Sequence, residues 1–245
     1  GNPFDPFKEW YQKDYQSFIE YNITDVELVD KLEDKMRLIE LCLTMAYDGK
    51  VNFTDVLGQV RYWDNMIYNH LRKKRIVIPQ KKEHEKSEKF EGAYVKDPQV
   101  GMHKWIMSFD LNSLYPHLIM QYNISPETLV DGCEMKEGMV DKILDGKVKS
   151  SKDYCMTPNG AFFRKDIRGF LPELMEKVYD DRVKYKKLML EAKQEYENTG
   201  DAAILKRISR YENIQMAKKI SLNSAYGAIG NSYFRYYDLM VATAI

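Results

Sequence analysis

The chain has 245 residues, of which 44% are hydrophobic and 30% charged, a balance typical of a globular protein that can bury a core of its own. Its 37 Lys and Arg residues are matched by 37 Asp and Glu residues, and a net charge of zero excludes nucleic-acid binding driven by overall charge. Any such contact must be local, and short basic clusters occur at residues 72–75, 184–187, 206–207 and 218–219.

The three cysteines are scattered and form no Cys-x-x-Cys pair, which argues against a structural zinc site or a disulfide framework. A reducing compartment such as the cytoplasm is expected. No apolar run approaches the roughly 20 residues that span a bilayer, so no membrane partner is expected. The chain starts at Gly1 and stops within the apolar residues 239–245, so we expect both ends to be cuts through a larger polypeptide.

The first third of the chain predicts mainly helices. Residues 1–20 predict a loop that leads into a helix, and apolar residues at helical spacing predict helices over 22–46 and 54–71. Residues 75–79 predict a short strand, and 81–89 predict a polar loop.

The middle of the chain predicts strands and turns. Apolar runs at 93–95 and 105–110 predict strands, the second buried and ending at Asp110, and Tyr115 begins a short helical pattern. Residues 131–170 contain repeated turn signals and predict an irregular segment of turns and loops.

The last third predicts a helical hairpin. Pro172 and Glu173 are typical of a helix start, and the helical pattern continues to Glu197. Residues 198–201 break it, and a second helical pattern covers 202–226. Two long helices joined by a tight polar turn predict an antiparallel pair, within an overall α+β fold.

Asp110 is the first candidate for chemistry. A carboxylate that closes an apolar run is costly to bury unless it is paired or bound to metal. It could cap the short helix that follows. Alternatively it could bind Mg²⁺ for nucleotidyl transfer, in which metal ions bridge the triphosphate and the primer 3′-hydroxyl.

The hairpin offers convergent positive charge. Arg182 and Lys186 are four residues apart and share a helix face, and Lys219, Asn223 and Tyr226 share a face of the return helix. An antiparallel hairpin can turn both groups toward one space, as a triphosphate would require.

Two segments carry a family resemblance. Ser-Phe-Asp-Leu-Asn-Ser-Leu-Tyr-Pro-His at 108–117 and Lys-Ile-Ser-Leu-Asn-Ser-Ala-Tyr-Gly at 219–227 resemble the first two polymerase motifs of family B DNA polymerases of the T-even bacteriophage type. Residues 123–127 and 234–238 share this likeness. The third polymerase motif, an Asp-Thr-Asp turn, does not occur in the sequence.

The resemblance implies roles for the first motif. Asp110 and the carbonyl of Leu111 would bind magnesium ions. The backbone of Ser113 and Leu114 would lie against the triphosphate. Tyr115 would lie under the sugar of the incoming nucleotide and leave no room for a 2′-hydroxyl, which would select deoxynucleotides.

The hairpin residues acquire roles from the same resemblance. Arg182, Lys186 and Lys219 would contact the phosphates, with Lys219 also part of the catalytic set. Asn223 and Tyr226 would line the pocket of the nascent base pair. Gly227 would let the backbone approach DNA closely.

A weaker likeness lies upstream. Tyr21 and Asp25 resemble the last motif of the proofreading 3′–5′ exonuclease, in which the Tyr orients water and the Asp binds metal. Residues 90–93, with Gly92 and Ala93, resemble a template-strand contact. The earlier exonuclease motif with its Asp-x-Glu pair is absent from the sequence.

The resemblance implies a domain order and partners. Primer–template DNA, a deoxynucleoside triphosphate (dNTP), the remaining polymerase segments and a sliding clamp would be the partners. This chain departs from the family pattern at His117, where a small residue is usual, and in the short turn at the hairpin tip.

The implied domains are the end of an exonuclease domain (1–38), a helical connector (39–80), the first half of an antiparallel palm (81–168), helical fingers (169–230) and a return into the palm (231–245).

Three other interpretations stay open. The chain could be one subunit of a naturally split polymerase, a non-catalytic nucleic-acid-binding remnant, or an unrelated helical module. Because two-metal chemistry needs at least a second carboxylate, we expect the isolated chain not to catalyse efficiently.

Overall fold

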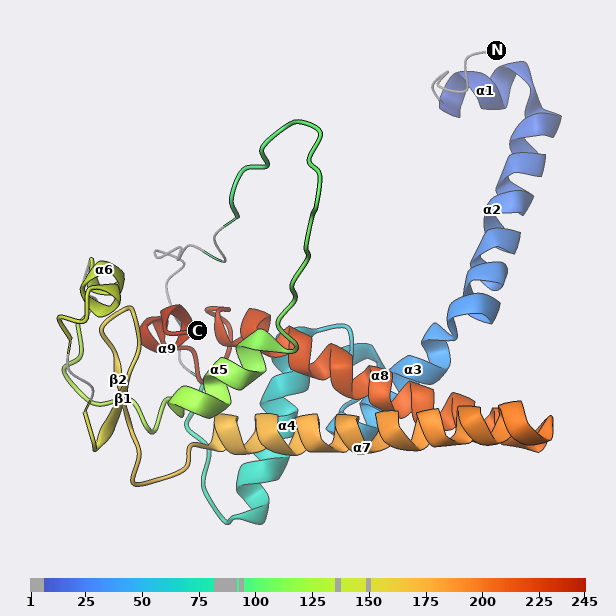
Figure 1. The fold of residues 1–245 in the computed structure, drawn as a ribbon. Coiled ribbons are helices and arrows are strands. Elements are labelled where there is room, and N and C mark those ends of the chain that lie inside the picture. The colour runs from blue at the N-terminus through green and yellow to red at the C-terminus, as the bar shows by residue number, and fades with distance from the viewer. Residues whose placement is uncertain (1–6, 82–91, 93–94, 135–137, 149–150) are drawn as a thin grey trace.

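The computed structural model describes residues 7–81, 92, 95–134, 138–148 and 151–245. This part of the chain is mostly helical, with one small sheet (Figure 1). Its elements are α1 (Phe7–Lys13), α2 (Tyr15–Met36), α3 (Leu38–Gly49), the 3₁₀ turn η1 (Phe53–Asp55), α4 (Gln59–Lys73), α5 (Leu114–Tyr122), α6 (Met139–Leu144), β1 (Tyr154–Met156), β2 (Phe162–Arg164), α7 (Phe170–Thr199), α8 (Ala203–Ile229) and α9 (Leu239–Thr243).

The predicted antiparallel hairpin is confirmed as α7 and α8, which run side by side (Figure 1). Gly200 ends α7 in the left-handed conformation (φ 66°), where its missing Cβ avoids a steric penalty. Near the tip, a small apolar cluster of Met189, Ala192, Ile204 and Ile208 holds the two helices together. The hairpin therefore has an apolar cluster of its own, separate from the main core.

The main core lies at the other end of the hairpin, where α3, α4, α5 and α9 pack against it. Tyr62 and Trp63 of α4 are each 1% exposed, and their polar atoms are satisfied by α8. The Tyr62 hydroxyl lies 2.8 Å from Ser221 Oγ, and Trp63 Nε1 donates to Ser224 Oγ at 3.1 Å. These bonds fix the base of α8, because a buried polar group without a partner would be destabilising.

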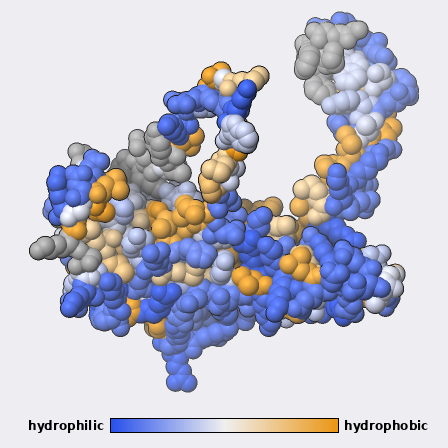
Figure 2. Space-filling view, viewed as in Figure 1, coloured by the Kyte–Doolittle hydropathy of each residue, from blue (hydrophilic) through white to orange (hydrophobic). Residues whose placement is uncertain are grey.

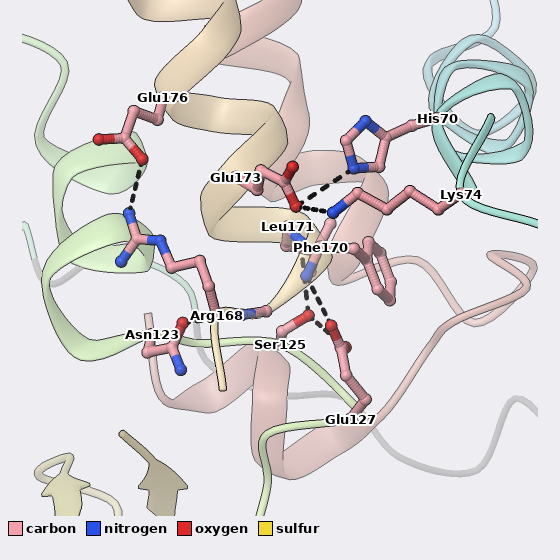
Figure 3. A network of polar contacts seen from close by, with 11 residues as sticks. His70, Lys74, Asn123, Ser125, Glu127, Arg168, Phe170, Leu171, Glu173 and Glu176 are labelled. Carbon is pink, nitrogen blue, oxygen red and sulfur yellow. Dashed lines mark hydrogen bonds and ion pairs between the residues drawn. The ribbon is translucent and has the colours of Figure 1, made fainter. Parts of the chain in front are cut away.

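The first turn of α7 is bound by the loop that follows α5 (Figure 3). Asn123 Oδ1 accepts from Gly169 N at 3.0 Å, and Glu127 Oε1 accepts from Phe170 N at 2.5 Å. Ser125 Oγ accepts from Leu171 N at 3.4 Å. Side chains from one short loop thus satisfy amides that a helix start leaves unpaired, and they join α5 to the hairpin.

An ion-pair group secures the same end of α7 from two other sides (Figure 3). Glu173 pairs with Lys74 and lies 3.5 Å from His70 Nε2, both near the end of α4. The hydrogen bond from Lys74 lowers the pKa of Glu173, whereas burial lowers the pKa of His70. Arg168 donates to the Met120 carbonyl of α5 and to Glu176 of α7.

The expected antiparallel palm sheet is confirmed only in part among the described residues, as a small antiparallel pair of strands. The only strands among them are β1 and β2, which pair antiparallel in a two-stranded sheet. Residues 105–110, predicted as a buried strand, lie in an extended loop whose apolar side chains are exposed, with Trp105 98% and Phe109 86% exposed (Figures 1 and 2). A strand needs a neighbour for its backbone hydrogen bonds, and no described segment pairs with this one. Residues 75–79 likewise form no strand.

The N-terminal helical pattern is confirmed but broken. Arg37 takes a left-handed conformation (φ 49°) between α2 and α3, and the Glu33 carboxylate accepts from the amides of Leu38 and Ile39. No residue of α2 is buried, and the helix projects from the body of the molecule (Figure 1). Most of its apolar side chains are therefore exposed. No helix among the described residues combines the length and apolarity needed to cross a membrane.

Candidate functional site

The turn before α5 is set by Ser113. Ser113, rather than Asp110, is the N-cap residue of α5, so the alternative that Asp110 caps this helix is wrong. Ser113 has left-handed backbone angles (φ 52°, ψ 46°), which cost a non-glycine residue about 1–2 kcal/mol. Such a conformation persists only where neighbouring groups hold it.

Two contacts bring the first motif onto the hairpin. Arg182 Nη1 of α7 donates to Ser113 Oγ at 3.1 Å. The rings of Tyr115 (α5) and Tyr226 (α8) stack with centroids 4.6 Å apart and planes 7° apart. Burial raises the pKa of Tyr226, and the neighbouring Tyr115 raises it further, so the phenol stays neutral. The two predicted motifs, more than a hundred residues apart, thus meet where α5, α7 and α8 converge.

The basic pair at 218–219 divides into two environments. Lys218 is buried, and its Nζ lies 2.7 Å from Asp48 Oδ1 and 3.4 Å from Asp181 Oδ2. Lys219, one residue further round the helix, is exposed. The Lys218–Asp181 ion pair also places two helix turns next to each other: the turn of α7 that carries Arg182 and the turn of α8 that carries Lys219.

The other predicted phosphate and base contacts are exposed. Lys186, Lys219 and Asn223 lie on the surface and make no hydrogen bond or ion pair with the residues that the structure describes. Arg182 is half-buried, and its Nε–H meets no acceptor there. A Cβ at Gly227 would lie 2.6 Å from Gln59 Oε1, so this glycine admits the α4 side chain against α8.

Asp110 and Leu111 are exposed, in contrast to the burial that we predicted for the carboxylate. Asp110 makes no hydrogen bond or ion pair within the described ranges. Nor do those ranges contain a group of three or more His, Cys, Asp or Glu residues that could hold a metal ion. The described residues alone therefore supply too few ligands to complete the expected Mg²⁺ site, and we assign no metal-dependent step to them.

The upstream candidates lie apart from this cluster. Tyr21 and Asp25 are exposed on α2, and the Tyr21 ring contacts Trp10 edge-on at 5.1 Å. Gly92 is exposed, and Ala93 falls outside the described residues. Leu114, at the first position of α5, is 41% exposed.

Sequence reasoning missed two residues of the cluster. His117 Nδ1 lies 2.9 Å from the Ser113 carbonyl oxygen, and its ring meets the Tyr179 ring of α7 edge-on at 4.7 Å. The sequence signalled His117 only as a departure from the motif. Tyr179 had no signal, because one tyrosine on a long helix is indistinguishable from a packing residue.

The hairpin and the motif turn packed at its base both lie within the span that one protein-family model matches. The model of that family, described as DNA polymerase family B, matches residues 56–245. The chain belongs to the family B DNA polymerases.

Individual relatives agree with this assignment. The chain is 34% identical to the DNA-directed DNA polymerase of Enterobacteria phage T4 over 99% of its own length and 32% of that protein. It is 34% identical to the corresponding polymerase of Escherichia phage RB69 over 98% of its own length and 31% of that protein. The chain thus spans about a third of the length of these relatives.

A solved structure supports the fold. The structure of the family B DNA polymerase from the hyperthermophilic archaeon Pyrobaculum calidifontis superposes with a TM-score of 0.68. The match covers 96% of this chain and 28% of that one at 22% identity, so it bears on the fold alone.

Proposed function

We propose that this chain forms the nucleotide-binding junction of a template-directed DNA polymerase, which adds a deoxynucleotide to a primer 3′-hydroxyl with release of pyrophosphate. The observation that carries the proposal is the convergence of the Ser113–Tyr115 turn on the hairpin through the Tyr115–Tyr226 stack and the Arg182–Ser113 hydrogen bond. A dNTP bound there would meet backbone groups on one side and cations on the other.

The charges and exposure of the hairpin suit the triphosphate. Lys186 and Lys219 keep their charges free of ion pairs with described residues, whereas Lys218 is neutralised by Asp48 and Asp181. Arg182 adds a half-buried guanidinium with an Nε–H that a phosphate oxygen would satisfy. Asn223 and Tyr226 would then face the new base pair, with Gly227 beside the DNA.

Tyr115 would select the sugar. Its ring stacks parallel to Tyr226, and moving away from a 2′-hydroxyl would require breaking this stack. Such a rigid aromatic wall rejects a ribose by steric exclusion rather than by hydrogen bonding.

The chemistry needs more than these residues. Asp110 would be one carboxylate of the metal-binding set, and two-metal chemistry requires at least a second. Tyr21 and Asp25 would belong to a proofreading site that is equally incomplete. We therefore expect the isolated chain to bind a dNTP weakly and to extend no primer.

Steady-state incorporation by the active polymerase that contains this chain tests the proposal. Lys219→Ala should lower kcat/KM for a dNTP about 10- to 100-fold, the effect of losing one charge-assisted hydrogen bond. Lys206→Ala is the matched control, because Lys206 is an exposed lysine near the far end of the same helix. Equal kcat/KM values for the two variants would contradict the proposal.

Ribonucleotide incorporation tests the sugar selection separately. Tyr115→Ala should raise the use of ribonucleotides, whereas Tyr115→Phe, which keeps the ring, should not. No gain with Tyr115→Ala would refute the role of Tyr115.

A second candidate function rests on the exposed segment 105–110. Ile106 and Met107 are 76% and 79% exposed beside Trp105 and Phe109. An extended apolar segment with unpaired backbone is suited to adding a strand to another sheet. It would pair either with a further segment of the same polypeptide or with a second chain of a split polymerase. The intact mass of the native polypeptide distinguishes the two, since a mass near 28.9 kDa would require a partner chain.

A further inference from the structure

His117 joins the motif turn to the hairpin. Its Nδ1 lies 2.9 Å from the Ser113 carbonyl oxygen, and its ring packs edge-on against Tyr179 at an interplanar angle of 82°. Because a carbonyl oxygen only accepts hydrogen bonds, Nδ1 must carry the proton. The backbone N–H of His117 donates to the same oxygen at 3.1 Å, so one residue supplies two donors to Ser113.

These donors act on the strained residue of the site. The carbonyl of Ser113 is held by His117, and its side-chain oxygen is held by Arg182. Together the two contacts fix a left-handed backbone that would otherwise relax. Relaxation of Ser113 would move the acceptor of Arg182 and the start of α5, which carries Tyr115.

We propose that His117 is a positioning residue for nucleotide binding, which acts through its hydrogen bond to Ser113 without touching the nucleotide. The inference rests on the proposed function of the Ser113–Arg182 junction. A residue that preorganises a site reduces the entropic cost of ordering that site when a ligand binds, so loss of the residue weakens binding. We therefore expect His117 to govern KM for the dNTP and to leave kcat nearly unchanged.

Two substitutions of similar size separate the hydrogen bond from the packing. His117→Asn keeps a side-chain donor, and His117→Leu removes it, while both lose the imidazole ring that faces Tyr179. Asparagine can make such a bond within a helix of this protein. Asn65 Nδ2 donates to the Arg61 carbonyl at 2.9 Å, and Asn69 Nδ2 donates to the Asn65 carbonyl at 2.8 Å, each four residues back.

The test is steady-state incorporation by the active polymerase that contains this chain. His117→Leu should raise KM for a dNTP about three- to tenfold, the effect of one hydrogen bond, with kcat within about twofold of wild type. His117→Asn should restore KM. In combination with Ser113→Ala, the effect of His117→Leu should be less than additive, because both changes act on the same residue. Equal KM values for the Leu and Asn variants, whether raised or unchanged, would overturn the proposal.

Hydrogen exchange without nucleotide separates this inference from the proposed function. His117→Leu should speed exchange of the amides of residues 117 and 118 at the start of α5, whereas His117→Asn should not. If the wild-type polymerase incorporates no nucleotide, the proposed function fails, and the exchange rates alone decide whether His117 holds the turn. Unchanged exchange in His117→Leu would show that it does not.

Discussion

Two adjacent lysines should differ in their effect on stability when each is changed to methionine. Lys218 is 7% exposed and pairs with Asp48 of α3 and Asp181 of α7. Lys218→Met keeps the length of the side chain but removes the charge. Asp48 Oδ2 is already buried without a hydrogen-bond partner among the described residues. The substitution would also remove the one cation with which Asp48 pairs in that part of the chain.

The expected loss of stability follows from this geometry. At 2.7 Å and an effective dielectric constant of about 20, the Lys218–Asp48 attraction is about 6 kcal/mol, much of which offsets the cost of burying the lysine. Removing one partner of a fully buried pair destabilises by about 3–5 kcal/mol. The Asp48 and Asp181 side chains are 28% and 37% exposed, so hydration of these carboxylates offsets part of the lost stability. We expect Lys218→Met to reduce the free energy of unfolding by about 2–4 kcal/mol.

Urea unfolding of the two variants is the assay. Lys219→Met, on the exposed side of the same helix, should change the free energy of unfolding by about 0.5 kcal/mol or less. The double change Lys218→Met with Asp48→Asn should recover part of the loss, because no unpaired charge remains at Asp48. A Lys218→Met protein as stable as Lys219→Met would refute the interpretation of Lys218 as a structural cation.

Three further outcomes are expected from the base of the hairpin and would be measured by urea unfolding. Gly169→Ala would place a Cβ 2.6 Å from Ser125 Cβ and should destabilise by about 1–3 kcal/mol. In Gly58→Ala the new Cβ would make only an ordinary 3.5 Å contact, so this variant should lose about 0.5 kcal/mol of stability or less. Similar losses of stability in both variants would contradict the packing argument. Asn123→Ala removes hydrogen bonds to Gly169 N and to the carbonyls of residues 164 and 167, so the free energy of unfolding should fall by about 2–3 kcal/mol. A fall below about 1 kcal/mol would count against the role of Asn123 in capping the start of α7. Because burial lowers the pKa of His70, the unfolded chain binds more protons just below pH 6.5, the ordinary pKa of histidine. Stability should therefore fall as pH drops from about 7.5 to about 5.5, and His70→Gln should flatten this slope, whereas an unchanged slope would exclude His70 as its source.

Local patterns predicted the helical parts of the chain well. Pro172, Glu173 and the break at 198–201 predicted a hairpin that the structure confirms within a few residues at each end. The short helix from Tyr115 is also confirmed, as α5. Helices satisfy their backbone hydrogen bonds within a short stretch of sequence, so their signals are local.

Strand pairing could not be predicted in the same way. The run at 105–110 has the composition of a buried strand, yet its side chains are exposed, because pairing depends on segments distant in sequence. The burial that we assigned to Asp110 failed for the same reason.

The sequence by itself determined the hairpin, the short motif helix and the family, because periodicity, turn residues and motif spacing are written along the chain. Only the tertiary structure decided which charges are structural. Lys218 and Lys219 are indistinguishable in sequence, but a turn of about 100° round α8 buries one against Asp48 and Asp181 and leaves the other exposed. It also decided that Tyr115 stacks on Tyr226 and that His117 packs on Tyr179, since contacts between distant segments depend on how whole helices pack.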